Sequence, residues 1–139
     1  MSQDIRISIP KADLARSFPI SDGWHEFEVI GVRAAPGKKD ANSVTYTITH
    51  KLVGDANERE IDHYFSSKAL GRMNVWIAAL TNKTVQEVLD SITTGTLDFS
   101  LSAQVGKHLM GKIGQEIVEG TGQVSSKMQD FAPVGKVPF

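Results

Sequence analysis

The sequence has no cysteine among its 139 residues. This absence excludes zinc ribbons, thiol catalysis and disulfide-supported scaffolds, and it is compatible with a reducing cytosol. The chain must therefore fold around its own apolar core, and its length is sufficient for one such domain. Its 40% of hydrophobic and 22% of charged residues are ordinary proportions for a globular protein.

Long hydrophobic runs are missing as well. The longest one covers only a few residues, so we expect no membrane-spanning segment. The N-terminal stretch from Met1 to Arg6 has no basic patch followed by an apolar run, and it does not predict a signal peptide. The sequence is thus interpreted as that of a cytoplasmic protein.

An excess of positive charge is also absent, since 15 basic and 16 acidic residues give a formal net charge of -1. Proteins that bind double-stranded DNA are often strongly basic because they face a dense line of phosphates. The charge balance disfavours that class. It is compatible with a single-strand binder, which combines a local basic groove with base stacking.

Motifs of catalysis are not found either. The four histidines are scattered singly over strand-like patterns and lack metal-binding spacing; they are His25, His50, His63 and His108. The glycine-rich stretch 111–122 lacks the ending of a phosphate-binding loop, and no Gly-x-Ser-x-Gly elbow occurs. We therefore predict no enzyme, no catalytic residue, no metal and no other cofactor.

What the sequence does contain is period-two alternation, the pattern of β-strands. It is clearest from Ser43 to Val53, where apolar or aromatic side chains alternate with three threonines and Lys51. Related patterns predict further strands over 24–33, 58–66, 107–119 and 124–132. In the first of these the alternation changes phase at Gly31, which predicts a β-bulge that bends the strand.

Between the third and fourth strands the apolar spacing becomes helical. A first helix is predicted after Ser66 or Ser67, either of which is available as N-cap. A second one is predicted after Thr84, because Thr84 and Glu87 have the spacing of a capping box. The predicted fold is therefore mostly β with a helical connector: strands 1–3, helix, strands 4–5. This is the order of a five-stranded OB-fold barrel.

The chain is divided into three parts: residues 1–22 as an N-terminal arm, 23–133 as the barrel domain and 134–139 as a mobile tail. In the arm, Ile5, Ile7 and Ile9 alternate with polar residues and predict a short strand that covers a sheet edge. Exposed edges invite pairing between copies, and we expect a homodimer.

Five short stretches, in this order and spacing, resemble a family of small single-stranded DNA-binding proteins encoded by bacteriophages, formerly a family of unknown function. They are Gly23-Trp24-His25-Glu26-Phe27, the threonine-rich second strand, Ile61-Asp62-His63-Tyr64-Phe65, Val105-Gly106-Lys107, and Lys127-Met128-Gln129-Asp130-Phe131-Ala132-Pro133. The resemblance covers roughly residues 23–133. It implies an OB-fold and sequence-tolerant binding of single strands beside phage replication or recombination proteins.

Binding a single strand requires cations that follow the phosphates and exposed aromatics on which bases stack. The candidate cations are Arg33, Lys38, Lys39, Lys51, Lys107, Lys112 and Lys127. Lys38 and Lys39 are the favoured pair, because the loop between the first two strands lines the cleft of an OB-fold. For each of the others, an ordinary solvated side chain is an equal alternative.

The candidate stacking residues are Tyr64 first and Trp24 second. Tyr64 is opposite in phase to Ile61 and is therefore predicted to point outward. Trp76, Phe27 and Tyr46 are predicted to belong to the core, because each shares its face with aliphatic residues.

The leading hypothesis is sequence-independent binding and protection of single-stranded DNA in the cytoplasm of an infected host. RNA is an alternative ligand, since nothing in the sequence recognises or rejects a 2′-hydroxyl. The alternative function is a non-enzymatic β-barrel that contacts other proteins, for example in virion assembly. The Pro138-Phe139 ending is similar to the partner-docking tail of bacterial single-strand binders, but the acidic run is missing, so a docking role is disfavoured.

Overall fold

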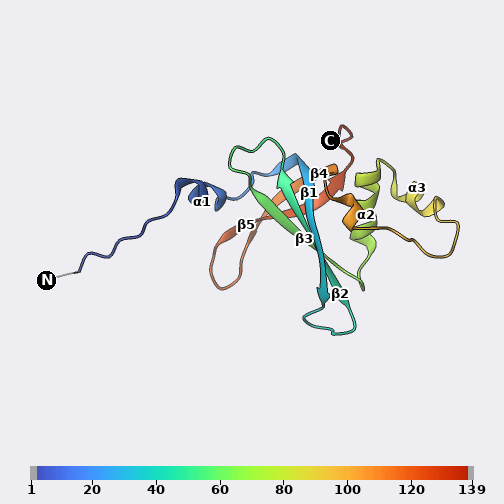
Figure 1. The fold of residues 1–139 in the computed structure, drawn as a ribbon, viewed down its shortest axis with the longest axis horizontal. Helices are drawn as coiled ribbons and strands as arrows, with labels where there is room; N and C mark the ends of the chain where they lie inside the picture. Colours follow the sequence, from blue (N-terminus) through green and yellow to red (C-terminus); the bar gives the residue numbers. More distant parts are fainter. Residues whose placement is uncertain (1–2, 138–139) are drawn as a thin grey trace.

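The computed structural model describes residues 3–137, and a single antiparallel sheet dominates it (Figure 1). Its strands are β1 (Gly23–Pro36), β2 (Val44–Leu52), β3 (Glu60–Ser66), β4 (His108–Ile117) and β5 (Val124–Ala132). They are ordered β3-β2-β1-β4-β5. All five strands lie where the alternation predicts them, with ends that differ by a few residues.

The sheet curls so that its two outermost strands approach each other. The ring of Phe131 in β5 lies 5.1 Å from that of His63 and 6.2 Å from that of Phe65, both in β3, measured between centroids. The curl begins in β1, whose pairing with β2 shifts between Val29 and Gly31, as the predicted bulge requires. Residues 23–28 of β1 pair with β4, whereas residues 27–36 pair with β2. The predicted fold class, a five-stranded OB-like sheet with a helical connector, is confirmed.

Helices fill the connection between β3 and β4. They are α2 (Gly71–Thr81), α3 (Val85–Asp90) and the 3-10 turn η1 (Ser102–Gln104). The predicted capping box of α3 is present, with Thr84 accepting from the Glu87 N–H and Glu87 accepting from the Thr84 N–H. The predicted start of α2 is wrong. Its N-cap is Leu70, because Ser67 Oγ instead accepts the Val44 N–H at 2.8 Å.

The core lies inside the curled sheet and under α2. Phe27 and Trp76 are fully buried, as predicted, and Tyr46 is half-buried against the same cluster. Trp76 Nε1 donates to His50 Nε2 over 3.1 Å, which joins α2 to β2. This bond makes His50 a buried acceptor, so the helical connector is fixed to the sheet by a polar contact as well as by packing.

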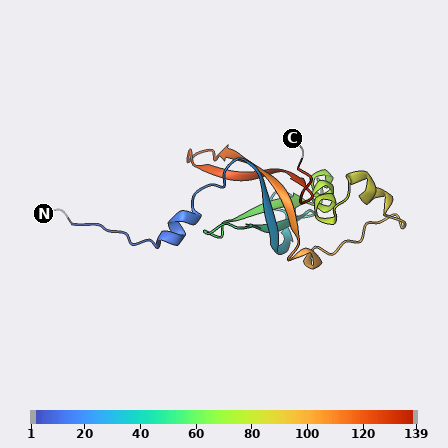
Figure 2. The same cartoon turned by 90° about the horizontal axis from the view of Figure 1, so that it is seen from above.

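The N-terminal arm extends away from the barrel (Figures 1 and 2). Residues 3–10 form neither helix nor strand, and Ile5 and Ile7 are 88% and 82% exposed. The predicted strand is therefore not formed, because no neighbouring strand pairs with it. A short helix, α1 (Lys11–Arg16), follows. The chain joins the barrel at Ile20, whose N–H donates to Ser126 Oγ at 2.7 Å.

Within the described residues, no helix is long and apolar enough to cross a membrane. The tail residue Phe139 lies outside the described residues.

Candidate nucleic-acid interface

An exposed tyrosine stands on the outer face of β3, beside a floor of threonines. Tyr64 is 62% exposed, whereas Phe65, next to it in the chain, points into the core. The strand register places Thr47 opposite Tyr64 on one side and opposite Arg33 of β1 on the other. The short Thr47 side chain is buried. The Tyr64 phenol and the Arg33 guanidinium therefore stand on either side of a shallow strip of the sheet.

This strip is the floor of an open hollow of about 800 Å³, which we call the β1–β3 hollow. It is bounded by the end of β1, the β1–β2 loop, β2 and β3. Its basic lining residues are Arg33, Lys38, Lys39 and Lys68, and Asp40 is the acidic one. Positive charge therefore surrounds the exposed ring on the side of the β1–β2 loop.

The ion pairs around this hollow are exposed and weak. Lys68 Nζ lies 3.5 Å from Asp40 Oδ2, and Arg33 Nη2 lies 3.4 Å from Asp62 Oδ2. The other oxygen of Asp62 accepts from Thr49 Oγ1 at 2.6 Å. Exposed pairs of this kind contribute little to stability, about 1 kcal/mol at most, so the cations can turn to another anion at little cost.

A second hollow of about 550 Å³ adjoins the first, and we call it the β3–β5 hollow. Tyr64 and Ser66 line both, so the two form one continuous surface. Arg72 of α2 and Lys127 of β5 supply its charge. Burial, the largest cause, and the positive charges of Arg72 and Lys127 together lower the pKa of the adjacent His63 to about 4. His63 is therefore neutral near neutral pH.

Arg72 is also held in place by an aromatic contact. Its guanidinium carbon lies 5.5 Å from the centroid of the Phe131 ring, within the range of a cation–π interaction. Lys127 Nζ lies 3.8 Å from Glu116 Oε2 in a pair of exposed side chains. The contact with Phe131 orients the Arg72 guanidinium at the surface. The exposed pair with Glu116 is weak, so another anion can compete for Lys127.

The structure brings five of the nine predicted binding residues together. Tyr64 lies between Arg33 and the two lysines of the β1–β2 loop on one side and Lys127 on the other. The five are Arg33, Lys38, Lys39, Tyr64 and Lys127.

The other four predicted residues lie elsewhere. Trp24 is half-buried and pairs with Lys112 across β1 and β4, nine positions along β1 from Arg33, or about 30 Å of extended strand. Lys107 precedes β4, where its carbonyl accepts the Val29 N–H at 2.9 Å. Lys51 shares the outer face of β2 but lies beyond the hollow, 3.5 Å from Glu58.

No model of a known protein family and no curated protein matches this chain. The resemblance to the phage proteins therefore stays a prediction, and the function has to be inferred from the chain's own residues.

Two basic residues at the hollows were not predicted, Lys68 and Arg72. Lys68 lies in the turn after β3 and Arg72 in the first turn of α2. The helical spacing in this stretch indicates a helix but does not indicate which of its side chains lie beside Tyr64. The one sequence feature that could have indicated them is that both lie within eight positions of Tyr64.

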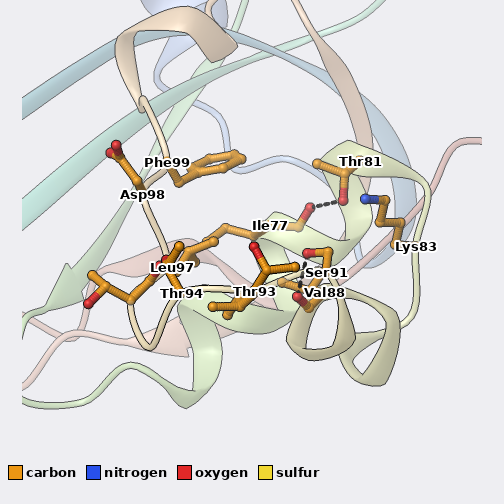
Figure 3. Close-up of a pocket in the computed structure, with 12 residues that line it drawn as sticks. Ile77, Thr81, Lys83, Val88, Ser91, Thr93, Thr94, Leu97, Asp98 and Phe99 are labelled. Atoms are coloured by element: carbon orange, nitrogen blue, oxygen red, sulfur yellow. Dashed lines mark hydrogen bonds between the residues drawn. The ribbon is translucent and has the colours of Figure 1, made fainter.

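A further hollow, of about 360 Å³, lies between α2, α3 and the loop that follows α3 (Figure 3). Its hydroxyls are occupied by helix carbonyls, since Thr81 Oγ1 donates to Ile77 O at 2.8 Å and Ser91 Oγ donates to Val88 O at 2.6 Å. Across residues 3–137, no group of three histidine or acidic side chains is placed to hold a metal ion. Among the described residues, Lys83 is the one basic residue that lines this hollow, so it lacks the several cations of the Tyr64 surface.

Proposed function

We propose that this protein binds single-stranded nucleic acid, DNA in the first place, without reading its sequence. It would serve to coat and protect single strands during phage replication or recombination. The observation that carries this proposal is the exposed Tyr64 ring between two adjoining basic hollows on one face of an OB-like sheet.

Binding at this surface combines base stacking on Tyr64 with charge from both hollows. A base stacked on Tyr64 contributes about 1–3 kcal/mol, and every base has a face that can stack. Phosphates on one side of that base face Arg33 and the β1–β2 loop lysines, and phosphates on the other side face Arg72 and Lys127. Both contacts are independent of base identity, so the expected binding is tolerant of sequence.

The distribution of charge supports this choice of face. On the outer face of β1 and β4, His108 Nδ1 lies 2.6 Å from Glu26 Oε2, and His108 Nε2 lies 3.9 Å from Glu28 Oε1. On that surface Lys51 lies opposite Glu28 and Lys112 lies opposite Trp24, so the two glutamates are balanced and cations are not in excess. Six cations line the Tyr64 surface. A net charge of -1 is therefore compatible with one attractive face for phosphates.

The proposal is tested by titrating a fluorescent oligothymidine, with a duplex and an oligouridine as comparisons, at low and moderate salt. Tight binding of the single strand, weak binding of the duplex and weakening with salt are the expected results. Equal binding of oligouridine would extend the ligand class to RNA. Absence of binding to every single strand at low salt would contradict the proposal. It would favour the alternative, a β-barrel that contacts other proteins.

A further inference from the structure

An apolar groove of about 380 Å³ lies between α2 and α3. Its lining is almost wholly aliphatic and comes from both helices and the following loop; the main contributors are Leu70, Met73, Ile77, Leu89, Ile92 and Leu97. Leu70 and Leu89 are 52% and 51% exposed, and Leu97 is 42% exposed. Three partly open leucines therefore surround one apolar groove.

The same chain carries a second uncovered apolar element, its N-terminal arm. Ile5, Ile7 and Ile9 are 88%, 82% and 51% exposed, and their period-two spacing would place them on one face if the arm adopts a strand conformation. The arm is held firmly where it leaves the barrel. Arg59 Nη1 donates to Pro19 O at 3.1 Å, and Gln115 Nε2 donates to Ile20 O at 2.7 Å.

The arm and the groove match in length. In an extended chain, the side chains from Ile5 to Ile9 span about 13 Å. On α2, Leu70, Met73 and Ile77 recur at helical spacing over about 10 Å. Three isoleucine side chains are therefore about as long as the groove that would receive them.

The two elements also match in charge. Residues 84–106 contain three acids, Glu87, Asp90 and Asp98, and no lysine or arginine. Residues 3–18 contain three basic and two acidic residues, with Arg6 Nε 2.6 Å from Asp4 Oδ2. The arm is thus weakly positive and the α3 side of the groove is negative, while the α2 side carries Arg72 and Lys83.

We propose that the arm of one copy docks with Ile5, Ile7 and Ile9 in the α2–α3 groove of a second copy. The arm and the groove lie at opposite ends of the molecule (Figures 1 and 2), so an arm that keeps this direction meets another copy's groove. If two copies each dock their arm in the other's groove, a closed dimer forms. If each arm docks in the groove of the next copy, an open chain of copies forms, and the contact is the same in both cases. This contact does not depend on nucleic acid.

The first experiment is sedimentation velocity of the full chain without nucleic acid. The unmodified protein is expected to associate as its concentration rises. Ile7→Asp and Leu89→Asp should each weaken association by about tenfold or more, because each places a charge in the apolar contact. Ile117→Asp is the matched control, since Ile117 is 69% exposed and lies outside both surfaces.

Mixing the two impaired variants gives the sharper result. The Leu89→Asp variant keeps an intact arm and the Ile7→Asp variant keeps an intact groove, so the mixture should form a one-to-one dimer and nothing larger. A monomeric unmodified protein at every concentration would overturn the proposal. So would a mixture that stays monomeric, or variants that associate as the unmodified protein does.

Because the chain has no cysteine, cross-linking can locate the contact. A mixture of the Ile7→Cys and Leu89→Cys variants should form a disulfide between the two chains under mild oxidation. Ile7→Cys mixed with Val53→Cys is the control for random collision, since Val53 is 40% exposed and lies outside the groove. If Ile7→Cys instead cross-links with Val124→Cys at the start of β5, the arm pairs with the sheet edge and the groove assignment is wrong.

Discussion

Tyr64 combines two properties that no other aromatic side chain of the five strands has. It is largely exposed, and basic side chains lie on both sides of it. Phe27, Phe65 and Phe131 are buried in the core, and Trp24 is half-buried on the opposite part of the sheet. Stacking of a base thus depends on this one ring within the barrel.

Tyr64→Ala is expected to lower the affinity for oligothymidine by about 1–3 kcal/mol, roughly 5- to 150-fold, because it removes the stacking surface. Fluorescence titration measures the change, and Tyr64→Phe should keep most of the affinity. Thermal unfolding should be nearly unaffected by either change, since the side chain is exposed. An equal loss with Trp24→Ala would mean that bases stack on Trp24, away from the two hollows.

His50 makes the stability of the fold depend on pH. Burial, the largest cause, and the neighbouring His63 together lower its pKa to about 4. Its Nε2 accepts from Trp76 in the neutral form, and its buried Nδ1 has no hydrogen-bond partner. Protonation in the folded state is therefore unfavourable.

We expect the free energy of unfolding to fall as the pH decreases from about 6.5 to about 4, because the unfolded chain binds a proton there and the folded one does not. The loss from His50 is on the order of 3 kcal/mol, complete below the folded pKa. Urea denaturation across this range measures it. His50→Gln keeps an acceptor for Trp76 and should make the fall in stability shallower, leaving the part that His63 contributes through its own lowered pKa. A profile unchanged by this substitution would rule out His50 as the cause.

At the scale of elements, the β1–β2 loop is the part that extends the basic surface beyond the sheet. Replacing Lys38 and Lys39 together by Gln should make the salt dependence of binding less steep. The slope of log K against log salt should change by about 1.4, or about 0.7 for each lost phosphate contact. Titrations at several salt concentrations measure the slope. Lys107→Gln with Lys112→Gln is the matched control and should leave the slope unchanged; the reverse pattern would contradict the assignment.

The helix α3 depends on its capping box, because Val88 is its one buried residue. Thr84→Ala should destabilise α3 by about 1 kcal/mol, which corresponds to roughly fivefold faster amide exchange in residues 85–90. Hydrogen–deuterium exchange detects this local opening, and Thr84→Ser should preserve the slow exchange. Equal exchange in all three proteins would mean that packing alone holds α3.

At the scale of the whole molecule, the fold separates charge that the sequence keeps nearly balanced. Six cations face the two hollows: Arg33, Lys38, Lys39, Lys68, Arg72 and Lys127. Glutamates and His108 occupy the outer face of β1 and β4. A phosphate backbone is therefore expected to bind at the Tyr64 surface, where cations are in excess.

From these six cations we expect the slope of log K against log salt for a single strand to be no steeper than about -4. Binding isotherms with oligothymidine between low and moderate salt provide the slope. A clearly steeper dependence would mean that cations outside the two hollows also contact phosphates, and Lys51 would be the first to test.

Much of the fold could be predicted because strand alternation and the capping box are local properties. Period two identifies which side chains of β2 and β3 point inward, and Gly31 marks the bend of β1. The predicted start of α2 was wrong because Ser67 Oγ accepts the N–H of Val44 in β2 instead of an N–H of the helix. The sequence does not indicate which of two possible N–H groups a serine hydroxyl will accept.

The sequence by itself determined the strands, their faces, the burial of Trp76 and the outward direction of Tyr64, since each follows from short-range periodicity. Only the tertiary structure decided which cations share a surface with that ring. The curl of the sheet brings Arg72 and Lys127 to Tyr64 and leaves Trp24 and Lys112 on another part of the barrel. The physical reason is that periodicity fixes the side of a strand on which a residue lies. Its neighbours across the barrel depend on bulges, twist and turns that act over many residues.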